Sequence, residues 1–184
     1  PFISLVWSGL LQLFPGPVGF IVFDNLLIWG ALAVMAAGAA RVVGQWGLMI
    51  LLVPAMPGLF NYLGHVHKDA MLVAWLLAAF ACAFVGNRDV AGPRVRIVWL
   101  GCANLLAVAA FLVRPNVIFA LIPLLLYVNH RLGRRKGVMV AAALLVLMPM
   151  TQSVQNRLLG VVPLHPADSI KTYHLLALSY FEGR

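Results

Sequence analysis

Long apolar runs separated by short polar segments make up most of this chain. A helix that crosses a bilayer needs about 20 mostly apolar residues, or somewhat fewer when neighbouring helices cover it. Six runs fit this description, at residues 18–40, 44–63, 71–85, 97–113, 116–127 and 137–150. Pro54 and Pro57 lie inside the second run and remove backbone donors, so we expect that helix to kink or unwind. The pattern therefore predicts an all-α, polytopic transmembrane helical bundle with about six spans.

The two ends of the chain depart from this pattern. Residues 1–14 are too few to cross a bilayer and include Trp7, which is typical of a helix that lies in the interface. After residue 150 the apolarity stops, and we expect an extracytoplasmic loop and an amphipathic helix around residues 173–181. The predicted domains are therefore 1–150, which is transmembrane, and 151–184, which is extracytoplasmic. Because the sequence begins at Pro1 without an initiator methionine, we expect upstream spans to be missing.

Composition and charge refine this prediction. The chain is 63% hydrophobic and only 10% charged, whereas soluble domains are about one-quarter charged. The net charge of +8 does not indicate a nucleic-acid partner, because basic residues collect in the cytoplasmic loops of membrane proteins and set their orientation. Eight of the 13 basic residues fall at position 41 or in the segments 86–96 and 130–136, namely Arg41, Arg88, Arg94, Arg96, Arg131, Arg134, Arg135 and Lys136. These positions are predicted to be cytoplasmic, and residues 61–69 and Arg114 extracytoplasmic.

The segment 61–69 is a polar stretch between two apolar runs. It contains His65, His67, Lys68 and Asp69, and ionisable groups beside a bilayer are costly unless they are paired, hydrated or used. Imidazole and carboxylate groups suit a divalent metal, but their spacing matches no standard zinc signature, so we expect no metal or other cofactor. One interpretation is a polar cavity at a membrane face, and the other is a hydrated loop between two helices.

Lys68 and Arg114 are candidates for binding a phosphate at the membrane surface, which requires cationic donors near the headgroups. Arg114 is predicted to end a span, because Pro115 follows it, and Asn116 offers a second donor. The alternative is that Lys68 pairs with Asp69 while the Arg114 side chain extends to the interface.

Asp24 is a further candidate, near the outer end of the first predicted span. It is either a proton-handling group or a charge at a helix start. Cys82 and Cys102 lie inside apolar runs, and we expect them to be buried thiols rather than a disulfide. The sequence contains no Ser-His-Asp arrangement, phosphate-cradling glycine loop or CxxC pair, so soluble hydrolase, nucleotide-binding and redox functions have no support.

Several short segments occur in an order that is familiar from one enzyme class. They are residues 1–11, residues 14–19 leading into a span with Trp29, and residues 63–69, 114–123 and 174–179. This order resembles bacterial multi-span glycosyltransferases of the GT-C class, whose members include protein mannosyltransferases and the lipid A aminoarabinose transferase. The resemblance implies a multi-pass enzyme of the bacterial cytoplasmic membrane. Its reaction would move a sugar from a polyprenyl-phosphate carrier to an envelope glycan or lipid acceptor on the extracytoplasmic side.

The resemblance also implies roles for particular residues. In such enzymes a carboxylate acts as general base while cations hold the carrier phosphate as it leaves. Lys68 and Arg114 would then bind the phosphate, and the remaining polar residues would shape the pocket, namely His65, His67, Asp69 and Asn116. The general base would then lie upstream of Pro1, outside this sequence.

Two other classes of function remain open. In a transporter or flippase, Asp24, the proline-broken 44–63 helix and the 61–69 segment would line a translocation path, as discontinuous helices do in transporters. In a purely structural membrane subunit, Lys68 and Arg114 would be replaceable without loss of activity.

Overall fold

A computed structural model describes residues 2–14, 16–60, 68–88 and 92–158, and all regular elements in these ranges are helical. In chain order the elements are α1 (Phe2–Leu13), α2 (Val18–Val43), η1 (Gly44–Ala55), α3 (Pro57–Phe60), α4 (Lys68–Gly86), α5 (Pro93–Val113), η2 (Pro115–Val117), α6 (Ile118–Asn129), η3 (His130–Leu132) and α7 (Arg134–Leu158). Within these ranges, five helical stretches are long and apolar enough to cross a membrane, namely Val18–Ala55, Lys68–Gly86, Pro93–Val113, Pro115–Leu132 and Arg134–Leu158. The predicted all-α fold is confirmed, and the chain is a multi-pass membrane protein.

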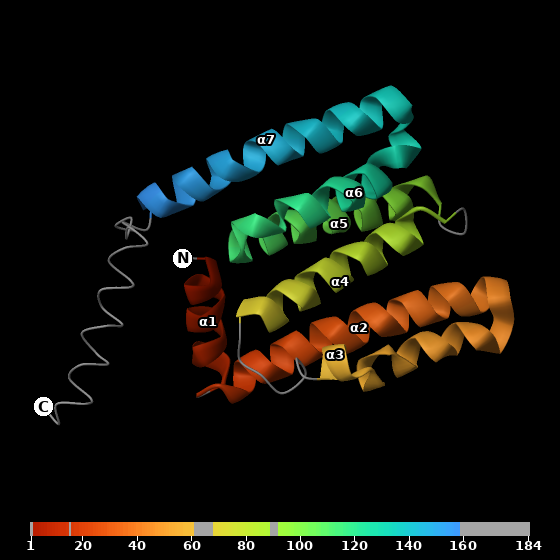
Figure 1. Cartoon of the computed structure of the whole chain (residues 1–184), viewed down its shortest axis with the longest axis horizontal. Coiled ribbons are helices and arrows are strands. Elements are labelled where there is room, and N and C mark those ends of the chain that lie inside the picture. Colours follow the sequence, from red (N-terminus) through yellow and green to blue (C-terminus); the bar gives the residue numbers. More distant parts are fainter. Residues whose placement is uncertain (1, 15, 61–67, 89–91, 159–184) are drawn as a thin grey trace, which may run out of the picture.

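The long helices run back and forth side by side, so the bundle has two distinct ends (Figure 1). At one end α2 meets η1, α4 leads to α5, and α6 leads to α7. The eight basic residues predicted to be cytoplasmic lie at this end, which we call the basic end. The other end holds Lys68, Asp69, Arg114, Asn116 and Arg157, and we call it the Arg114 end. Helix α1 lies crosswise there, an orientation expected of an interfacial helix.

The second predicted span differs from its prediction. The chain folds back at Gly44, whose φ of 62° favours glycine, and η1 packs along α2 as a 3-10 helix (Figure 1). At about 2.0 Å per residue, its 12 residues extend about 24 Å, more than an α-helix of that length. The expectation of an α-helix over 44–63 is therefore wrong in helix type. The predicted break is confirmed, because Met56 is extended before Pro57 and separates η1 from α3.

Helix α4 lies at the centre and packs against α2, α5 and α6. Its buried positions are mostly alanine, which lets neighbouring helix backbones approach closely. Ala74, Ala78 and Ala81 contribute to the core shared with α2. Between α5 and α6, the amides of Asn104 and Asn129 exchange hydrogen bonds of 3.0 and 3.3 Å. These bonds satisfy two polar side chains inside an otherwise apolar bundle.

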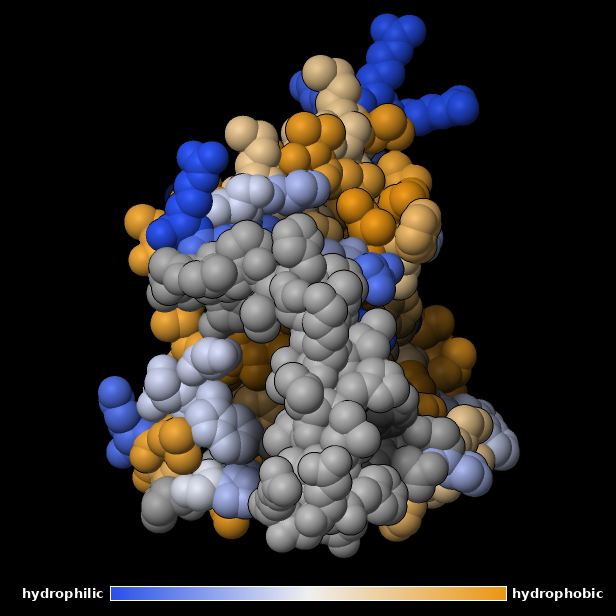
Figure 2. All heavy atoms as spheres, turned by 60° about the vertical axis from the view of Figure 1, so that its left-hand side comes forward, coloured by the Kyte–Doolittle hydropathy of each residue, from blue (hydrophilic) through white to orange (hydrophobic). Residues whose placement is uncertain are grey.

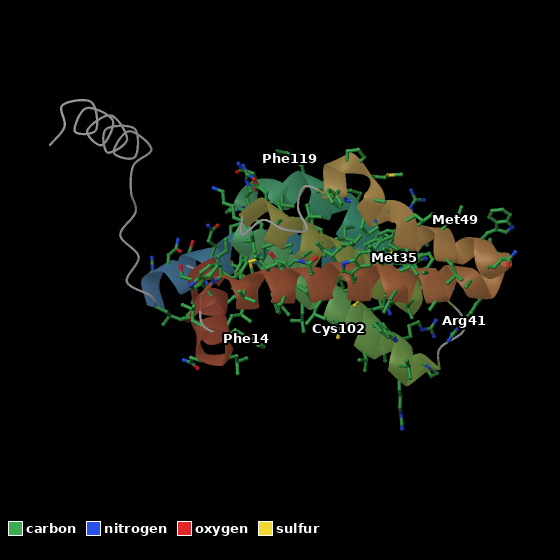
Figure 3. All side chains as sticks on the ribbon, turned by 90° about the horizontal axis from the view of Figure 1, so that it is seen from below. Phe14, Met35, Arg41, Met49, Cys102 and Phe119 are labelled. Atoms are coloured by element: carbon green, nitrogen blue, oxygen red, sulfur yellow. The ribbon has the colours of Figure 1, made fainter. Side chains whose placement is uncertain are left out.

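Large apolar side chains face outward along the spans, as expected where lipid surrounds the protein. Leu105 is 71% exposed and Phe119 is 80% exposed, and Phe119 points away from the bundle (Figure 3). In the coloured part of Figure 2, hydrophobic side chains are widespread and hydrophilic ones stand out in separate groups. Cys82 and Cys102 are free thiols, as expected, but Cys102 is exposed rather than buried because it lies on the outer side of α5.

The end of α1 and the end of α7 can be compared with the boundaries predicted from the sequence. Helix α1 ends at Leu13, close to the predicted limit at residue 14, and Gly16 has a positive φ of 76°. Helix α7 continues past the predicted boundary at residue 150 to Leu158. The helix is therefore longer than the apolar run that predicted it, and its last turns are formed by mostly polar residues. The amphipathic helix predicted around 173–181 lies outside the described residues.

Candidate functional site

An ion pair between Asp69 and Arg114 is the central feature of the Arg114 end. The Arg114 guanidinium donates a hydrogen bond from Nη1 to Oδ1 of Asp69. The two residues are far apart in sequence and meet because α4 and α5 are antiparallel neighbours, so the start of α4 lies beside the end of α5. Their side chains are 29% and 40% exposed, so the pair lies at the surface of the bundle end, within reach of a ligand.

The backbone fixes the position of both residues. Asp69 lies in the first turn of α4, where the unpaired N–H groups of a helix start stabilise a carboxylate. Arg114 follows the last residue of α5 in an extended conformation, as expected before Pro115. Its N–H donates to the Ala110 carbonyl at 3.2 Å, and its own carbonyl accepts from the Val117 N–H at 3.0 Å. The arginine therefore projects from a well-defined turn rather than from a loose loop.

The other predicted phosphate ligands divide into two groups. Lys68 begins α4 directly before Asp69, and Asn116 lies in η2 two residues after Arg114, and both are exposed. These four residues thus share one end of the bundle. The predicted alternative is an ion pair between Lys68 and Asp69. The observed ion pair is instead between Arg114 and Asp69. His65 and His67 lie outside the described residues.

A layer of aromatic and aliphatic side chains lies between the site and the middle of the bundle. Phe20, Met71 and Val113 are buried together, and Met71 and Val113 lie close in sequence to Asp69 and Arg114. Helix α1 adds rings to this layer: Trp7 packs against Phe20 with 5.0 Å between ring centroids, and Phe2 packs edge-on against Trp75 at 5.8 Å. The charged pair is therefore separated from the middle of the bundle by closely packed apolar side chains.

Asp24 is more deeply buried than the Asp69–Arg114 ion pair. It is only 2% exposed and lies beyond the first turn of α2, which contains no acidic residue. Neither of its carboxylate oxygens has a hydrogen-bond partner among the described residues, and the same is true of the Trp75 indole nitrogen. The interpretation of Asp24 as a helix-start charge is therefore wrong, because the apolar run places it about two turns into the helix.

The described ranges contain no group of three or more His, Cys, Asp or Glu side chains that could hold a metal ion. The expectation that no metal or other cofactor is bound stays a prediction, since two of the candidate ligands, His65 and His67, lie outside those ranges.

Comparisons with family models, with curated protein sequences and with solved structures found no match to this chain. The resemblance to GT-C glycosyltransferases therefore remains a prediction.

The sequence predicts Asp69 and Arg114 as site residues separately, but not their pairing. A signal for it was present: when two antiparallel helices are joined by a short loop, residues at similar distances before and after that loop come together. Asp69 and Arg114 satisfy this condition about the loop between α4 and α5. The burial of Asp24 had no such signal, because its depth depends on how α1 and α4 cover α2.

Proposed function

We propose that this chain is part of a membrane glycosyltransferase that holds the phosphate of a polyprenyl-phosphate sugar at the Arg114 end. The observation that carries the proposal is the Asp69–Arg114 ion pair. It orients a guanidinium group at the bundle end that also carries Lys68, and it leaves the arginine side chain 40% exposed. A flat, fixed guanidinium is well suited to a phosphate because its donors match two phosphate oxygens at once.

The chemical role of these residues follows from their charge. When a sugar leaves a polyprenyl phosphate, negative charge grows on the phosphate, and oriented cations stabilise that charge. Arginine has five N–H donors, one of which bonds to Asp69 at Oδ1, so others can reach a ligand. Lys68 and Asn116 would add donors from the same end of the bundle. Asp69 is proposed as a positioning residue and not as the general base.

Binding rather than turnover tests this proposal, because binding does not depend on a general base. The purified protein in lipid nanodiscs would be titrated with a polyprenyl phosphate and, separately, with the uncharged polyprenol. We expect the phosphate to bind more tightly. Arg114→Ala should weaken phosphate binding about tenfold, which corresponds to about 1.4 kcal/mol and to the loss of one charge-assisted hydrogen bond. Arg157→Ala is the matched control, since it removes an exposed cation from the same end.

Two substitutions of Asp69 separate positioning from charge. Asp69→Asn keeps an oxygen acceptor for Arg114 but removes a negative charge at roughly 7 Å from a bound phosphate. That charge opposes binding by about 0.6 kcal/mol in a water-like dielectric, so binding should tighten about threefold. Asp69→Ala also releases the guanidinium and should weaken binding. Equal binding of polyprenol and its phosphate, or no effect of Arg114→Ala, would rule the proposed site out.

A second candidate function rests on Asp24. A buried carboxyl group without a partner inside a span is a common feature of transporters that move protons or ions. Under this alternative, the protein in liposomes would carry an ion or lipid across the membrane, and Asp24→Asn would stop the flux. The glycosyltransferase proposal instead expects Asp24→Asn to leave binding of polyprenyl phosphate unchanged.

A further inference from the structure

The basic end contains a cavity that the proposed function does not use. It has a volume of about 180 Å³ and lies between α2, α4 and α5, where it is lined by Val34, Ala37, Gly38, Arg41, Val85, Arg88 and Trp99. Most of this lining is apolar, but two guanidinium groups belong to it. Arg41 and Ala37 are exposed, so the cavity reaches the surface of the molecule. A ligand that combines an anionic group with an apolar tail would match both parts of the lining.

Arg88 is held in place by contacts on both of its sides. Its guanidinium donates a hydrogen bond from Nη1 to the carbonyl of Gly38, and its central carbon lies 4.1 Å from the centroid of the Phe84 ring. Gly38 leaves room for the Phe84 ring, because a Cβ atom there would lie 3.1 Å from the ring and would make it shift by a few tenths of an ångström. The guanidinium therefore has a fixed position before any ligand binds, and its other donors can face the cavity.

The charge around the cavity favours an anion. The basic end carries eight of the 13 basic residues, and Arg41 lies there with the start of α5 nearby (Figure 3). The described ranges contain two acidic residues, Asp24 and Asp69, and both lie toward the Arg114 end, whereas Asp89, which follows Arg88 in the sequence, lies outside those ranges. Among the described residues, neither Arg41 nor Arg88 therefore faces a carboxylate.

The depth of the cavity points to a lipid rather than to a soluble anion. From Arg41 to Val34 it follows α2 inward for about 10 Å at 1.5 Å per residue. This distance is similar to that between a phosphate group and the upper part of an acyl chain. Trp99 also lines the cavity, about two turns into α5, and its ring adds to the apolar part of the lining that an acyl chain would contact. Basic pockets between membrane helices on the cytoplasmic side bind anionic headgroups in the same way.

We propose that this cavity binds an anionic phospholipid of the adjacent leaflet, with its phosphate on Arg41 and Arg88 and its acyl chain along Val34 and Trp99. The site is independent of the proposed sugar transfer at the other end of the bundle. The lipid would remain bound as a structural ligand where α2, α4 and α5 meet.

Trp99 provides a direct probe of this site. The purified protein in a neutral detergent would be titrated with phosphatidylglycerol or phosphatidylcholine that carries bromine on the acyl chain, which quenches nearby tryptophan. Subtracting the signal of a Trp99→Phe variant isolates the contribution of Trp99. We expect brominated phosphatidylglycerol to quench Trp99 at a concentration at least fivefold lower than brominated phosphatidylcholine.

Three variants separate the site from general charge. Arg41→Ala combined with Arg88→Ala should abolish the preference for phosphatidylglycerol. Arg135→Ala combined with Lys136→Ala removes two exposed cations from the same end and should keep it. Ala37→Phe fills the cavity without changing charge and should reduce quenching by both lipids, so the test does not depend on Arg88, which also stabilises the fold. Equal quenching by the two lipids in the unmodified protein, or the same loss in both double variants, would overturn the proposal.

Discussion

Replacing Asp24 by leucine should stabilise the protein, although most substitutions of buried residues destabilise. Asp24 is 2% exposed, and neither carboxylate oxygen has a hydrogen-bond partner among the described residues. One turn to either side, Phe20 and Ile28 are 3% and 0% exposed, so the surroundings are apolar. A buried polar group without a partner costs about 1–3 kcal/mol. Leucine has the same branching as aspartate and removes that cost, so we expect a gain of about 1–3 kcal/mol in the free energy of unfolding.

The measurement is reversible unfolding in mixed detergent and SDS micelles, followed by circular dichroism. Asp69→Leu is the control, because that aspartate lies at the surface in an ion pair with Arg114 and its loss should destabilise by no more than about 1 kcal/mol. The two substitutions should therefore have opposite signs. A loss of more than about 1 kcal/mol for Asp24→Leu would show that its carboxyl group makes a bond in the protein, and the reasoning from its isolation would be wrong.

Three further predictions concern the packing of η1, the strength of the ion pair and the orientation in the membrane. Gly47→Ala should cost at least about 1–3 kcal/mol, because its Cβ would lie 2.3 Å from a backbone nitrogen in α2, whereas Gly30→Ala meets nothing within 4 Å and should be neutral or slightly stabilising in the same unfolding measurement. A double-mutant cycle on Asp69 and Arg114 should give a coupling of about 0.2–1 kcal/mol that falls as salt is added; a coupling above about 3 kcal/mol would mean that the pair is buried. A single cysteine at Lys136, in a background without the two native cysteines, should react with an impermeant maleimide only from the cytoplasmic side, and labelling from outside would reverse the predicted orientation.

The sequence determines where the helices of this protein lie, because polar segments separate the apolar runs and the ends of these runs carry clear signals. Pro57 ends η1 by forcing Met56 into an extended conformation, and Pro115 ends α5 in the same way at Arg114. The sorting of basic residues to one end also follows from the sequence, since an alternating path of spans brings every second loop to the same face.

Other features depend on three-dimensional contacts that no local pattern encodes. The 3-10 form of η1 is one example: its apolar residues would suit an α-helix equally well, and the close contact of Gly47 with α2 is a property of the packed hairpin. The choice of Arg114 rather than Lys68 as the partner of Asp69 is another. It depends on the register between α4 and α5, whereas sequence reasoning considered only the neighbouring residue.

The two proposed anion sites differ in a way that suits different ligands. At the Arg114 end, a phosphate must share its guanidinium with Asp69, which limits affinity but keeps the arginine oriented when the site is empty. At the basic end, Arg88 is held by an uncharged carbonyl and an aromatic ring, so its orientation does not depend on a competing negative charge. A ligand that must leave after each reaction fits the first arrangement, because release requires moderate affinity. A lipid that stays bound fits the second, since the two groups that hold Arg88, the Gly38 carbonyl and the Phe84 ring, carry no negative charge.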